Sequence, residues 1–348
     1  MKQILLGKSL EELKVLARDL GLPAYTAGQM AMWLYQKRIK SIDEMTNLSK
    51  AAREMLNRDY EVGRIEYSQK FVSVDGTKKY LFRIPEADRY VETVMIPEYE
   101  TGAGGDIERA TLCVSSQVGC KMNCQFCMTG RGGFHGQLSA AEILSQFMAV
   151  DESAQLTNAV FMGMGEPLDN WENVKRVLEI ICSDWGFAWS PKRVTLSTIG
   201  VIPKLKSFLD ESRCHLAVSL HNPFPEERAA LMPVQKGYPI EDVIALLRQY
   251  DFTGQRRVSF EYTMFAGVND TKRHADALVR LLRGLECRIN LIRFHAIPDS
   301  KLRTSSPETM DAFRTRLANA GITTTIRASR GEDIMAACGL LAGKGLEK

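Results

Sequence analysis

The sequence predicts an α/β protein in which a small N-terminal helical region precedes a parallel sheet covered by helices. Six short apolar, β-branched runs between residues 110 and 294 alternate with helix-like stretches, as repeated βα units do. Before them, residues 1–90 contain helix-start and hairpin signals without this alternation. The βα units by themselves leave two architectures open, a barrel and an open doubly wound sheet.

The N-terminal region is expected to hold three helices and a hairpin. Ser9 and Thr26 each precede a Glu or Gln by three residues, the spacing of a capping box, and Ser49 is an N-cap residue before "KAAREMLNRDY". The alternation in "KFVSVDGTKKYLFRI" around its Asp-Gly pair predicts a β-hairpin. We therefore expect an N-terminal helical accessory domain plus β-hairpin at residues 1–90, and the βα units with the C-terminal segment at residues 91–348.

Composition indicates an ordinary globular protein. The 348 residues are 45% hydrophobic and 25% charged, which excludes disordered, collagen-like and small disulfide-scaffold classes. We find neither the apolar core and cleavage site of a signal peptide nor an apolar run long enough for a membrane span. We therefore expect a cytoplasmic location, where eight cysteines act as metal ligands, catalytic thiols or small buried residues.

Positive charge is concentrated in the N-terminal region. Residues 1–90 hold 16 Lys/Arg against 12 Asp/Glu, whereas the rest of the chain holds 29 against 30. A basic region can bind a polyanion, although an excess of this size is also ordinary scatter. Lys78 and Lys79 in the hairpin are candidate contacts to a nucleic-acid backbone, whereas Trp33 and Tyr35 are expected in the core.

Residues that carry chemistry gather at the ends of the predicted strands. Because the C-terminal ends of the strands of a βα barrel form one mouth, we expect these side chains to share a site. In chain order they are Cys120, Cys124 and Cys127; Gly163, Gly165 and Glu166; Ser197, Thr198 and Gly200; Ser219 and His221; Asn269 and Asp270; and His295.

The stretch "CKMNCQFC" places three thiols on one loop, an arrangement that favours an iron–sulfur cluster or zinc. A structural zinc site needs a fourth ligand, and the nearest histidine, His135, is far for such spacing. Three thiolates on a four-iron cluster would instead leave one iron open to a substrate or cofactor. A zinc-binding module remains the alternative from a different functional class.

Taken together, these motifs resemble a known family. "CKMNCQFC" has the cysteine spacing of radical S-adenosylmethionine (SAM) enzymes, and "RATLCVSSQVGC", "GMGEP", "TLSTIG", "VSLH", "VND" and "RGEDIMAACG" are similar to the RlmN/Cfr family of RNA adenine methyltransferases. The likeness runs from about residue 90 to 340, with a weaker echo in the N-terminal helices. It implies a partial (β/α)6 radical SAM barrel with a 4Fe–4S cluster and SAM as cofactors, the cluster bound by Cys120, Cys124 and Cys127.

The resemblance also implies a reaction. Members most like this chain methylate carbon 2 of adenosine in 23S rRNA and in tRNA, with an S-methylcysteine intermediate and two SAM molecules per turnover. The alternative within the family is carbon-8 methylation of 23S rRNA adenosine, the reaction of the Cfr branch, which often has alanine in place of Pro167. A SAM-independent iron–sulfur electron carrier is a further alternative, but it would leave "GMGEP" and Cys338 without a purpose.

Three residues match the catalytic positions of the family. Cys338 would take a methyl group from SAM, and Cys113 would release the product by forming a disulfide with Cys338. Glu92, in the "VET" stretch, would accept the proton of the adenine ring. Without the resemblance, Glu92 would be interpreted as an exposed strand residue.

The SAM contacts are also implied by the resemblance. The backbone and carboxylate of the Gly165–Glu166 motif would hold the amino group of SAM. The further expected contacts are Ser197, Ser219, Leu220, His221 and His295, the last standing where many relatives have asparagine. Taken one at a time, a strand-end serine or histidine is an ordinary cap or core group, and "GMGEP" is compatible with a tight turn that needs glycine.

The expected partners follow from the same resemblance. They are 23S rRNA and tRNA as substrates, with the target base extruded from folded RNA, and an electron donor such as flavodoxin. We expect no membrane association, and we expect a monomer.

Overall fold

The computed structural model describes residues 2–99 and 107–343 and is built on one long sheet. Among these residues, ten strands pair in the order β14-β13-β12-β11-β10-β9-β6-β5-β4-β3. Their bounds are β3 Tyr67–Val72, β4 Lys78–Ile84, β5 Arg89–Tyr99, β6 Ile107–Cys113, β9 Asn158–Phe161, β10 Val194–Thr198, β11 His215–Ser219, β12 Val258–Met264, β13 Arg288–Arg293 and β14 Thr323–Ile326.

Within this sheet, the seven strands from β6 through β9 to β14 pair parallel with one another. Between each of these parallel strands and the next one in the sheet the chain forms at least one helix, as parallel pairing requires. This confirms the six predicted βα units, and the ends of the sheet stay apart as in a partial barrel. The helices are α5 Ala140–Ala149, α6 Trp171–Cys182, α7 Ile202–Glu211, α8 Pro225–Leu231, α9 Ile240–Leu247, α10 Lys272–Leu282 and α11 Pro307–Asn319.

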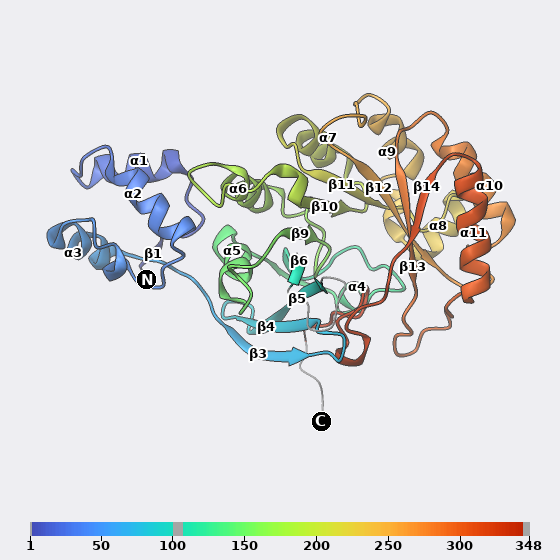
Figure 1. The fold of residues 1–348 in the computed structure, drawn as a ribbon, viewed down its shortest axis with the longest axis horizontal. Coiled ribbons are helices and arrows are strands. Elements are labelled where there is room, and N and C mark those ends of the chain that lie inside the picture. The colour runs from blue at the N-terminus through green and yellow to red at the C-terminus, as the bar shows by residue number, and fades with distance from the viewer. Residues whose placement is uncertain (1, 100–106, 344–348) are drawn as a thin grey trace.

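The N-terminal helices form a module at the end of the molecule opposite α10 and α11 (Figure 1). The capping box at Ser9 and the N-cap at Ser49 are confirmed. The capping box predicted at Thr26 is wrong, because Tyr25 precedes the helix and Thr26 is already its first residue. The module consists of β1 Gln3–Ile4, α1 Leu10–Asp19, α2 Thr26–Ala31, the π-helix η1 Met32–Gln36, the 3₁₀ turn η2 Ile42–Glu44, α3 Lys50–Asp59 and β2 Tyr60–Glu61.

The predicted hairpin forms, and it extends the main sheet. β3 pairs antiparallel with β4, which pairs antiparallel with β5, and β5 with β6. The hairpin is therefore continuous with the parallel strands rather than grouped with the N-terminal helices. The domain boundary at residue 90 remains a prediction.

Short elements complete the region around the strand ends. Between β6 and α5 the chain makes β7 Gln117–Gly119, α4 Met128–Arg131 and β8 Phe134–Gln137. The remaining short turns are the 3₁₀ helices η3 Pro191–Arg193, η4 Pro233–Lys236 and η5 Glu332–Ile334. None of the helices in the described part of the chain is long and apolar enough to cross a membrane.

All eight cysteines lie in the described part of the chain, and all are free thiols. Cys214 is buried, as expected of a small apolar residue, but Cys182 and Cys287 are only half-buried. The sulfur atoms of Cys182 and Cys214 are 3.8 Å apart, so these two thiols pack against each other.

Candidate active site

A small hairpin inserted after β6 encloses the three-cysteine loop. β7 and β8 pair on either side of it, and the N–H of Cys120 donates to the Gly133 carbonyl at 2.9 Å. Gly119 has φ +77°, and a Cβ atom there would lie 1.9 Å from the Gly133 oxygen, so the turn needs glycine. At the other end, the N–H of Cys127 donates to the Cys124 carbonyl at 3.1 Å, just before α4.

Two of the thiols on this loop, Cys120 and Cys124, have pKa values above the ordinary value of a cysteine. Burial raises the pKa of Cys120 to about 12, and Cys127 adds to the effect. Burial also raises the pKa of Cys124, as do the charges of Cys127 and Cys120. The three thiols thus lie close enough to repel one another as thiolates, and the positive charge of bound iron would compensate.

The donor set fits an iron–sulfur cluster. Among the described residues, no group of three His, Cys, Asp or Glu side chains converges as the ligands of one metal ion would. The three cysteines of a cluster bind different irons and need not converge on one point. Soft sulfur donors on one loop are the ligands that such a cluster requires.

Aromatic packing fixes the middle of the cysteine loop against the strand ends. The ring of Phe126 meets the His221 imidazole with centroids 4.8 Å apart and the Phe265 ring at 5.3 Å. The N–H of Gln125 donates to the Leu231 carbonyl at 3.0 Å. The loop is therefore packed against residues that follow β11 and β12.

The Glu166 carboxylate joins the loop after β9 to the end of β10. One oxygen accepts hydrogen bonds from Thr198 Oγ1 at 2.6 Å and from the Leu168 N–H at 3.1 Å. The other accepts from the Ile199 N–H at 3.0 Å, and burial raises the pKa of Glu166 to about 7. Both oxygens of this carboxylate already accept hydrogen bonds from within the protein. The backbone is therefore the part of the motif better suited to bind a ligand.

Gly165 brings this motif against the strand that leads to the cysteines. Its φ is +100°, and a Cβ atom there would lie 2.5 Å from the Gln117 Cβ. The Gln117 side chain accepts from the Glu166 N–H at 2.8 Å and donates to Asp169 at 2.7 Å. Sequence reasoning missed Gln117, whose only signal was its place just before the cysteines.

The ends of β10 and β11 present the next group of expected SAM contacts. Ser197 and Ser219 are half-buried at these strand ends, and Leu220 is fully buried. The buried Arg228 donates to the Ser219 and Leu220 carbonyls, each at 3.0 Å. Burial lowers the pKa of Arg228 to about 10, opposed by its attraction to Cys124. Arg228, a single basic residue in an expected helix, was not predicted to belong to the site.

His221 is a neutral, fixed ring. Its Nδ1 accepts from the Thr263 N–H at 2.9 Å, so the ring proton resides on Nε2. Burial, followed by the charge of Arg228, lowers its pKa to about 3. The residue has φ +56°, and Asn269 Nδ2 donates to its carbonyl at 2.6 Å, which holds this uncommon backbone conformation.

His295, expected to contact SAM, faces the C-terminal segment in this structure. Its Nε2 lies 3.1 Å from Ser329 Oγ, and its Nδ1 lies 3.3 Å from a Glu332 carboxylate oxygen. Both ring nitrogens therefore interact with the segment after β14, and the SAM contact remains a prediction.

Glu92 and Cys113 are brought together by strand register. Val94 pairs directly with Cys113, so Glu92 lies on the same face two residues away. The Ser115 hydroxyl donates to the Glu92 carbonyl at 2.5 Å, and the Glu92 N–H donates to Met164 Sδ at 3.3 Å. Glu92 is only 1% exposed, so its interpretation as an exposed strand residue is wrong.

The prediction that the two hairpin lysines contact a nucleic-acid backbone is also corrected. Lys79 is buried and forms an ion pair with Glu92 at 3.5 Å, with its Nζ 5.5 Å from the Phe71 ring centre. Lys78 forms an ion pair with the buried Glu152. Alternation along β4 sends these neighbours to opposite faces, and their pairing with carboxylates argues against backbone contacts to nucleic acid.

The C-terminal segment binds back to the turn of the hairpin. The Gly331 N–H donates to the Asp75 carboxylate at 2.9 Å. The Asp333 carboxylate accepts from the Ser73 hydroxyl at 2.5 Å and from the Val74 N–H at 3.2 Å. The hairpin turn, expected to face RNA, instead anchors the segment that carries Cys338.

A second set of contacts places the segment beside the cysteine loop. The Met128 N–H donates to the Gly339 carbonyl at 2.8 Å, and the Thr129 hydroxyl donates to the Leu341 carbonyl at 2.6 Å. Apart from the single turn η5, residues 331–343 form no regular element. Cys338 therefore lies in an irregular segment that is hydrogen-bonded to the hairpin turn before it and to the end of the cysteine loop after it.

Cys113 and Cys338 lie within electrostatic reach of each other. Burial raises the pKa of Cys113 to about 12, and the charge of Cys338 raises it further. Burial of the thiol and then the charge of Glu261 raise the pKa of Cys338, although the residue as a whole is exposed. The Arg327 guanidinium opposes these effects at both thiols. Sequence reasoning missed Glu261 and Arg327; a glutamate inside an apolar strand was the available signal.

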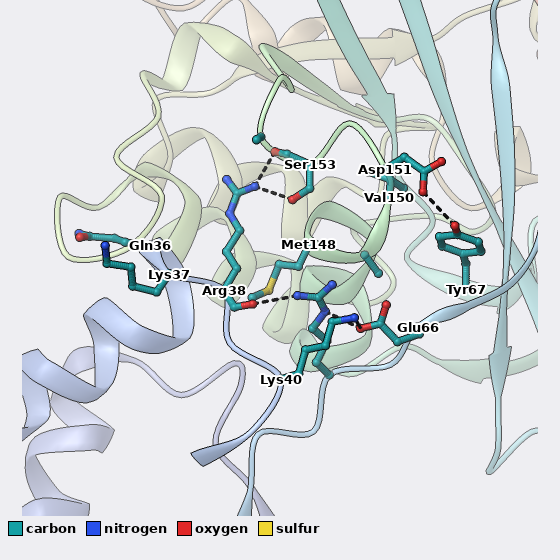
Figure 2. A pocket seen from close by; sticks show the side chains of 13 residues that line it. Gln36, Lys37, Arg38, Lys40, Glu66, Tyr67, Met148, Val150, Asp151 and Ser153 are labelled. Atoms are coloured by element: carbon teal, nitrogen blue, oxygen red, sulfur yellow. Dashed lines mark hydrogen bonds and ion pairs between the residues drawn. The ribbon is translucent and has the colours of Figure 1, made fainter. Parts of the chain in front are cut away.

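A separate cavity of about 870 Å³ lies between the N-terminal module and the sheet (Figure 2). Its lining includes Lys37, Arg38, Lys40 and Arg64, and none of the predicted site residues. Arg38 donates to the carbonyl and hydroxyl of Ser153, and Arg64 donates to the Arg38 carbonyl at 2.9 Å. These arginines join the module to the segment after α5.

Two family models match separate parts of the chain. The family model described as "Radical SAM superfamily" matches residues 114–279, which include the three cysteines and the Gly165–Glu166 motif. The model described as "Ribosomal RNA large subunit methyltransferase N-terminal domain" matches residues 4–62. The two models thus cover the barrel and the helical module separately.

Whole-chain relatives cover nearly the full length. The chain is 58% identical over 341 residues to the probable dual-specificity RNA methyltransferase RlmN of Porphyromonas gingivalis strain ATCC 33277, covering 98% of this chain and 94% of that protein. It is 41% identical over 344 residues to the dual-specificity RNA methyltransferase RlmN of Syntrophus aciditrophicus, covering 98% and 96%. A crystal structure of a radical SAM methyltransferase from Sphaerobacter thermophilus superposes with a TM-score of 0.90 at 37% identity, covering 98% of this chain and 100% of that one. The chain therefore belongs to the RlmN family of radical SAM RNA methyltransferases, whose cofactors are a 4Fe–4S cluster and SAM.

Proposed function

We propose that this enzyme methylates carbon 2 of adenosine in 23S rRNA and in tRNA. The observation that carries the proposal is the assembly of the three-cysteine loop, the Gly165–Glu166 motif and the segment bearing Cys338 around the same strand ends. The names of the relatives, dual-specificity RNA methyltransferases, support both RNA substrates. Carbon-8 methylation is not favoured, because these relatives carry the RlmN name.

The cofactors have recognisable sites among the residues present. Cys120, Cys124 and Cys127 would hold the cluster, and the backbone of Gly165 and Glu166 would accept the amino group of SAM. Ser197, Ser219, Leu220, His221 and His295 would contact the rest of SAM. When bound, the cluster and SAM supply the methyl group and the one-electron chemistry that an electron-poor ring carbon requires.

The chain's own residues would carry the polar steps. Cys338 would take up the methyl group as a thioether and, after that group has lost one hydrogen atom to the one-electron chemistry that SAM and the cluster supply, would bond to the base through the resulting methylene carbon. Glu92 removes the proton from the ring carbon, and Cys113, as a thiolate, attacks the Cys338 sulfur. The new disulfide replaces the bond between sulfur and the methylene carbon, which then takes up a proton as the product is released.

Burial of Glu92 and Cys113 serves this step. Both side chains lie on one face of the sheet, beside the segment that carries Cys338. Because Glu92 is only 1% exposed, its carboxylate would be shielded from proton exchange with bulk water. The disulfide between Cys113 and Cys338 must be reduced by cellular thiols before the next cycle.

The partners beyond RNA follow from the chemistry. We place the enzyme in the cytoplasm, where reducing conditions keep its eight cysteines as thiols and an electron donor such as flavodoxin can serve the cluster. The net charge of the N-terminal region supports contacts with RNA phosphates there. We propose a monomer as the active form.

The proposal is tested by nucleoside mass spectrometry. Unmodified ribosomal RNA and tRNA are incubated anaerobically with reconstituted protein, SAM and a reductant, and the nucleosides are compared with synthetic standards. 2-Methyladenosine from both RNAs is the expected product. 8-Methyladenosine would assign the chain to the other reaction, and neither product despite SAM cleavage would refute the RNA substrate.

A further inference from the structure

Lys79 is a lysine that the reaction scheme does not use, yet it is almost completely buried on β4. Only 1% of its surface is exposed. Burying an ammonium group costs free energy unless it is paired, so such a lysine needs a compensating interaction. Its position therefore calls for an explanation beyond strand formation.

The register of three neighbouring strands places Lys79 at the catalytic face. Lys79 on β4 pairs with Val94 on β5, and Val94 pairs with Cys113 on β6. Directly paired residues project to the same side of a sheet, so Lys79 and Cys113 share one face with Glu92. The lysine stands one strand away from Glu92 and two strands away from Cys113.

The ammonium group lies between Glu92 and the C-terminal segment. Its Nζ is 3.5 Å from Glu92 Oε2 and donates to the Met335 carbonyl at 3.5 Å. The other Glu92 oxygen accepts from the Ala342 N–H at 3.3 Å. Met335 and Ala342 stand before and after Cys338, so the Lys79–Glu92 pair contacts the segment on both sides of the reactive thiol.

We infer that Lys79 is a positioning residue for the product-release step. Its ammonium group holds the Glu92 carboxylate and the Met335 carbonyl in one arrangement, which fixes the proton acceptor relative to the segment of Cys338. The inference rests on the proposed function, since it assigns Lys79 to the step in which Glu92 takes the ring proton. Lys79 touches neither RNA nor SAM in this scheme and acts through Glu92.

If the Lys79–Glu92 ion pair were only structural, a different result would be expected. Loss of such a pair would lower the stability of the fold and slow every step to a similar degree. Loss of a positioning residue leaves the early steps intact and delays proton removal, so the covalent RNA–Cys338 adduct accumulates. The two roles are separated by measuring the steps individually.

The experiment compares Lys79→Met with Lys78→Met in reconstituted holoenzyme. Lys78 is the adjacent lysine, paired with Glu152 on the other face, and serves as the matched control. Four quantities are followed with unmodified rRNA: SAM cleavage, methylation of Cys338 by peptide mass spectrometry, RNA–protein adduct on a denaturing gel, and free 2-methyladenosine. Glu92→Gln provides the reference for blocked proton removal.

We expect Lys79→Met to cleave SAM and methylate Cys338 normally, to accumulate adduct, and to release product roughly 10- to 100-fold more slowly, as losses of supporting groups do. Lys78→Met should behave like the unaltered protein, and Lys79→Arg should restore part of the release rate because it keeps the charge. If Lys79→Met does not fold, Lys79→Gln is measured in its place.

Two results would overturn the inference. One is product release from the Lys79 variants at the rate of Lys78→Met. The other is an equal loss of all four quantities, which would identify Lys79 as structural only. Failure of the proposed function is distinguishable, because Cys113→Ala would then trap no adduct in otherwise unaltered protein.

Discussion

Glu92 and Cys113 lie on one face of neighbouring antiparallel strands, because Val94, two residues from Glu92, pairs directly with Cys113. Diagonal neighbours of this kind are within reach of one molecule bound against the face. The Ala342 N–H meets the Glu92 carboxylate at 3.3 Å, so the segment after Cys338 closes over the same place. The base and the thiol proposed to end the reaction are therefore set by strand register.

Substitution of Cys113 by alanine should trap RNA on the protein. Without this thiol, no disulfide can replace the bond between the Cys338 sulfur and the methylene carbon. The RNA should therefore stay covalently attached to Cys338 once the first adduct has formed. A band at the combined mass of protein and RNA on a denaturing gel is expected, with Cys287→Ala as a control away from the site. Free methylated RNA in normal yield would remove Cys113 from this role.

Substitution of Cys338 by alanine should abolish RNA methylation while SAM cleavage persists. The alanine cannot accept the methyl group, whereas the cysteine loop and the Gly165–Glu166 motif are untouched. Detection of cleaved SAM by chromatography, alongside the absence of methylated adenosine, checks the outcome. Full turnover by the variant would contradict a protein-bound methyl carrier.

Each of the three loop cysteines should be indispensable for the cluster. Alanine at Cys120, Cys124 or Cys127 would remove one of the three proposed sulfur ligands, and residues 120–127 contain no further cysteine or histidine to replace it. Iron content and the visible absorbance of reconstituted protein should both fall to background. Cys214→Ala, distant in sequence and buried, is the comparison; a variant of the loop with unchanged iron would disprove its assignment as a ligand.

Replacement of Gly165 by alanine should weaken both stability and SAM binding. The residue has φ +100°, and the new Cβ would collide with Gln117 at 2.5 Å. We expect the free energy of unfolding to fall by roughly 1–3 kcal/mol, from backbone strain and displacement of Gln117. Urea unfolding and calorimetric titration with SAM measure the two effects, and Gly136→Ala is the control because a Cβ there meets no atom within 4 Å.

The buried ring of His221 predicts loss of stability in mild acid. Burial lowers its pKa from the ordinary value of 6.5 to about 3, so between these values only the unfolded chain gains the proton. The free energy of unfolding should therefore fall as pH decreases through this range, by up to about 1.4 kcal/mol per pH unit.

Urea midpoints measured from about pH 7 to about pH 4 test this dependence on His221. His221→Asn should show a shallower decline, whereas His135→Asn, which changes an exposed ring, should follow the unaltered protein. Equal slopes in all three proteins would exclude His221 as the origin.

The sequence predicted the βα units and the strand ends at which the candidate site residues lie, because both depend on local patterns. Apolar runs become strands, and strand ends become the mouth, so Ser197, Ser219 and His295 were correctly placed at strand ends. The capping box at Ser9 formed for the same local reason. The capping signal at Thr26 failed, since Tyr25 starts that helix without any side-chain cap.

What the sequence could not provide were pairings between distant residues. The burial of Lys79 beside Glu92 depends on the register of two strands and on a segment more than 250 residues later. Arg327 and Glu261 joined the site for the same reason, because only the assembled sheet brings them near Cys338. The irregular path of residues 331–343 also escaped prediction, because it is held by tertiary hydrogen bonds rather than by helical periodicity.

The hydrogen bonds that anchor Cys338 join residues as far as 260 positions apart, from Ser73 to Asp333. Contacts of such sequence separation form late, and a ribosome delivers the chain from its N-terminus. The hairpin turn is therefore made before the barrel, whereas its hydrogen-bond partner Asp333 is made after it. A chain made as far as the end of β14 at Ile326 already holds the helical module and every strand of the main sheet, yet it still lacks Cys338. The thiol proposed to bond to the base is therefore among the last parts of the enzyme to be made and to be held in place.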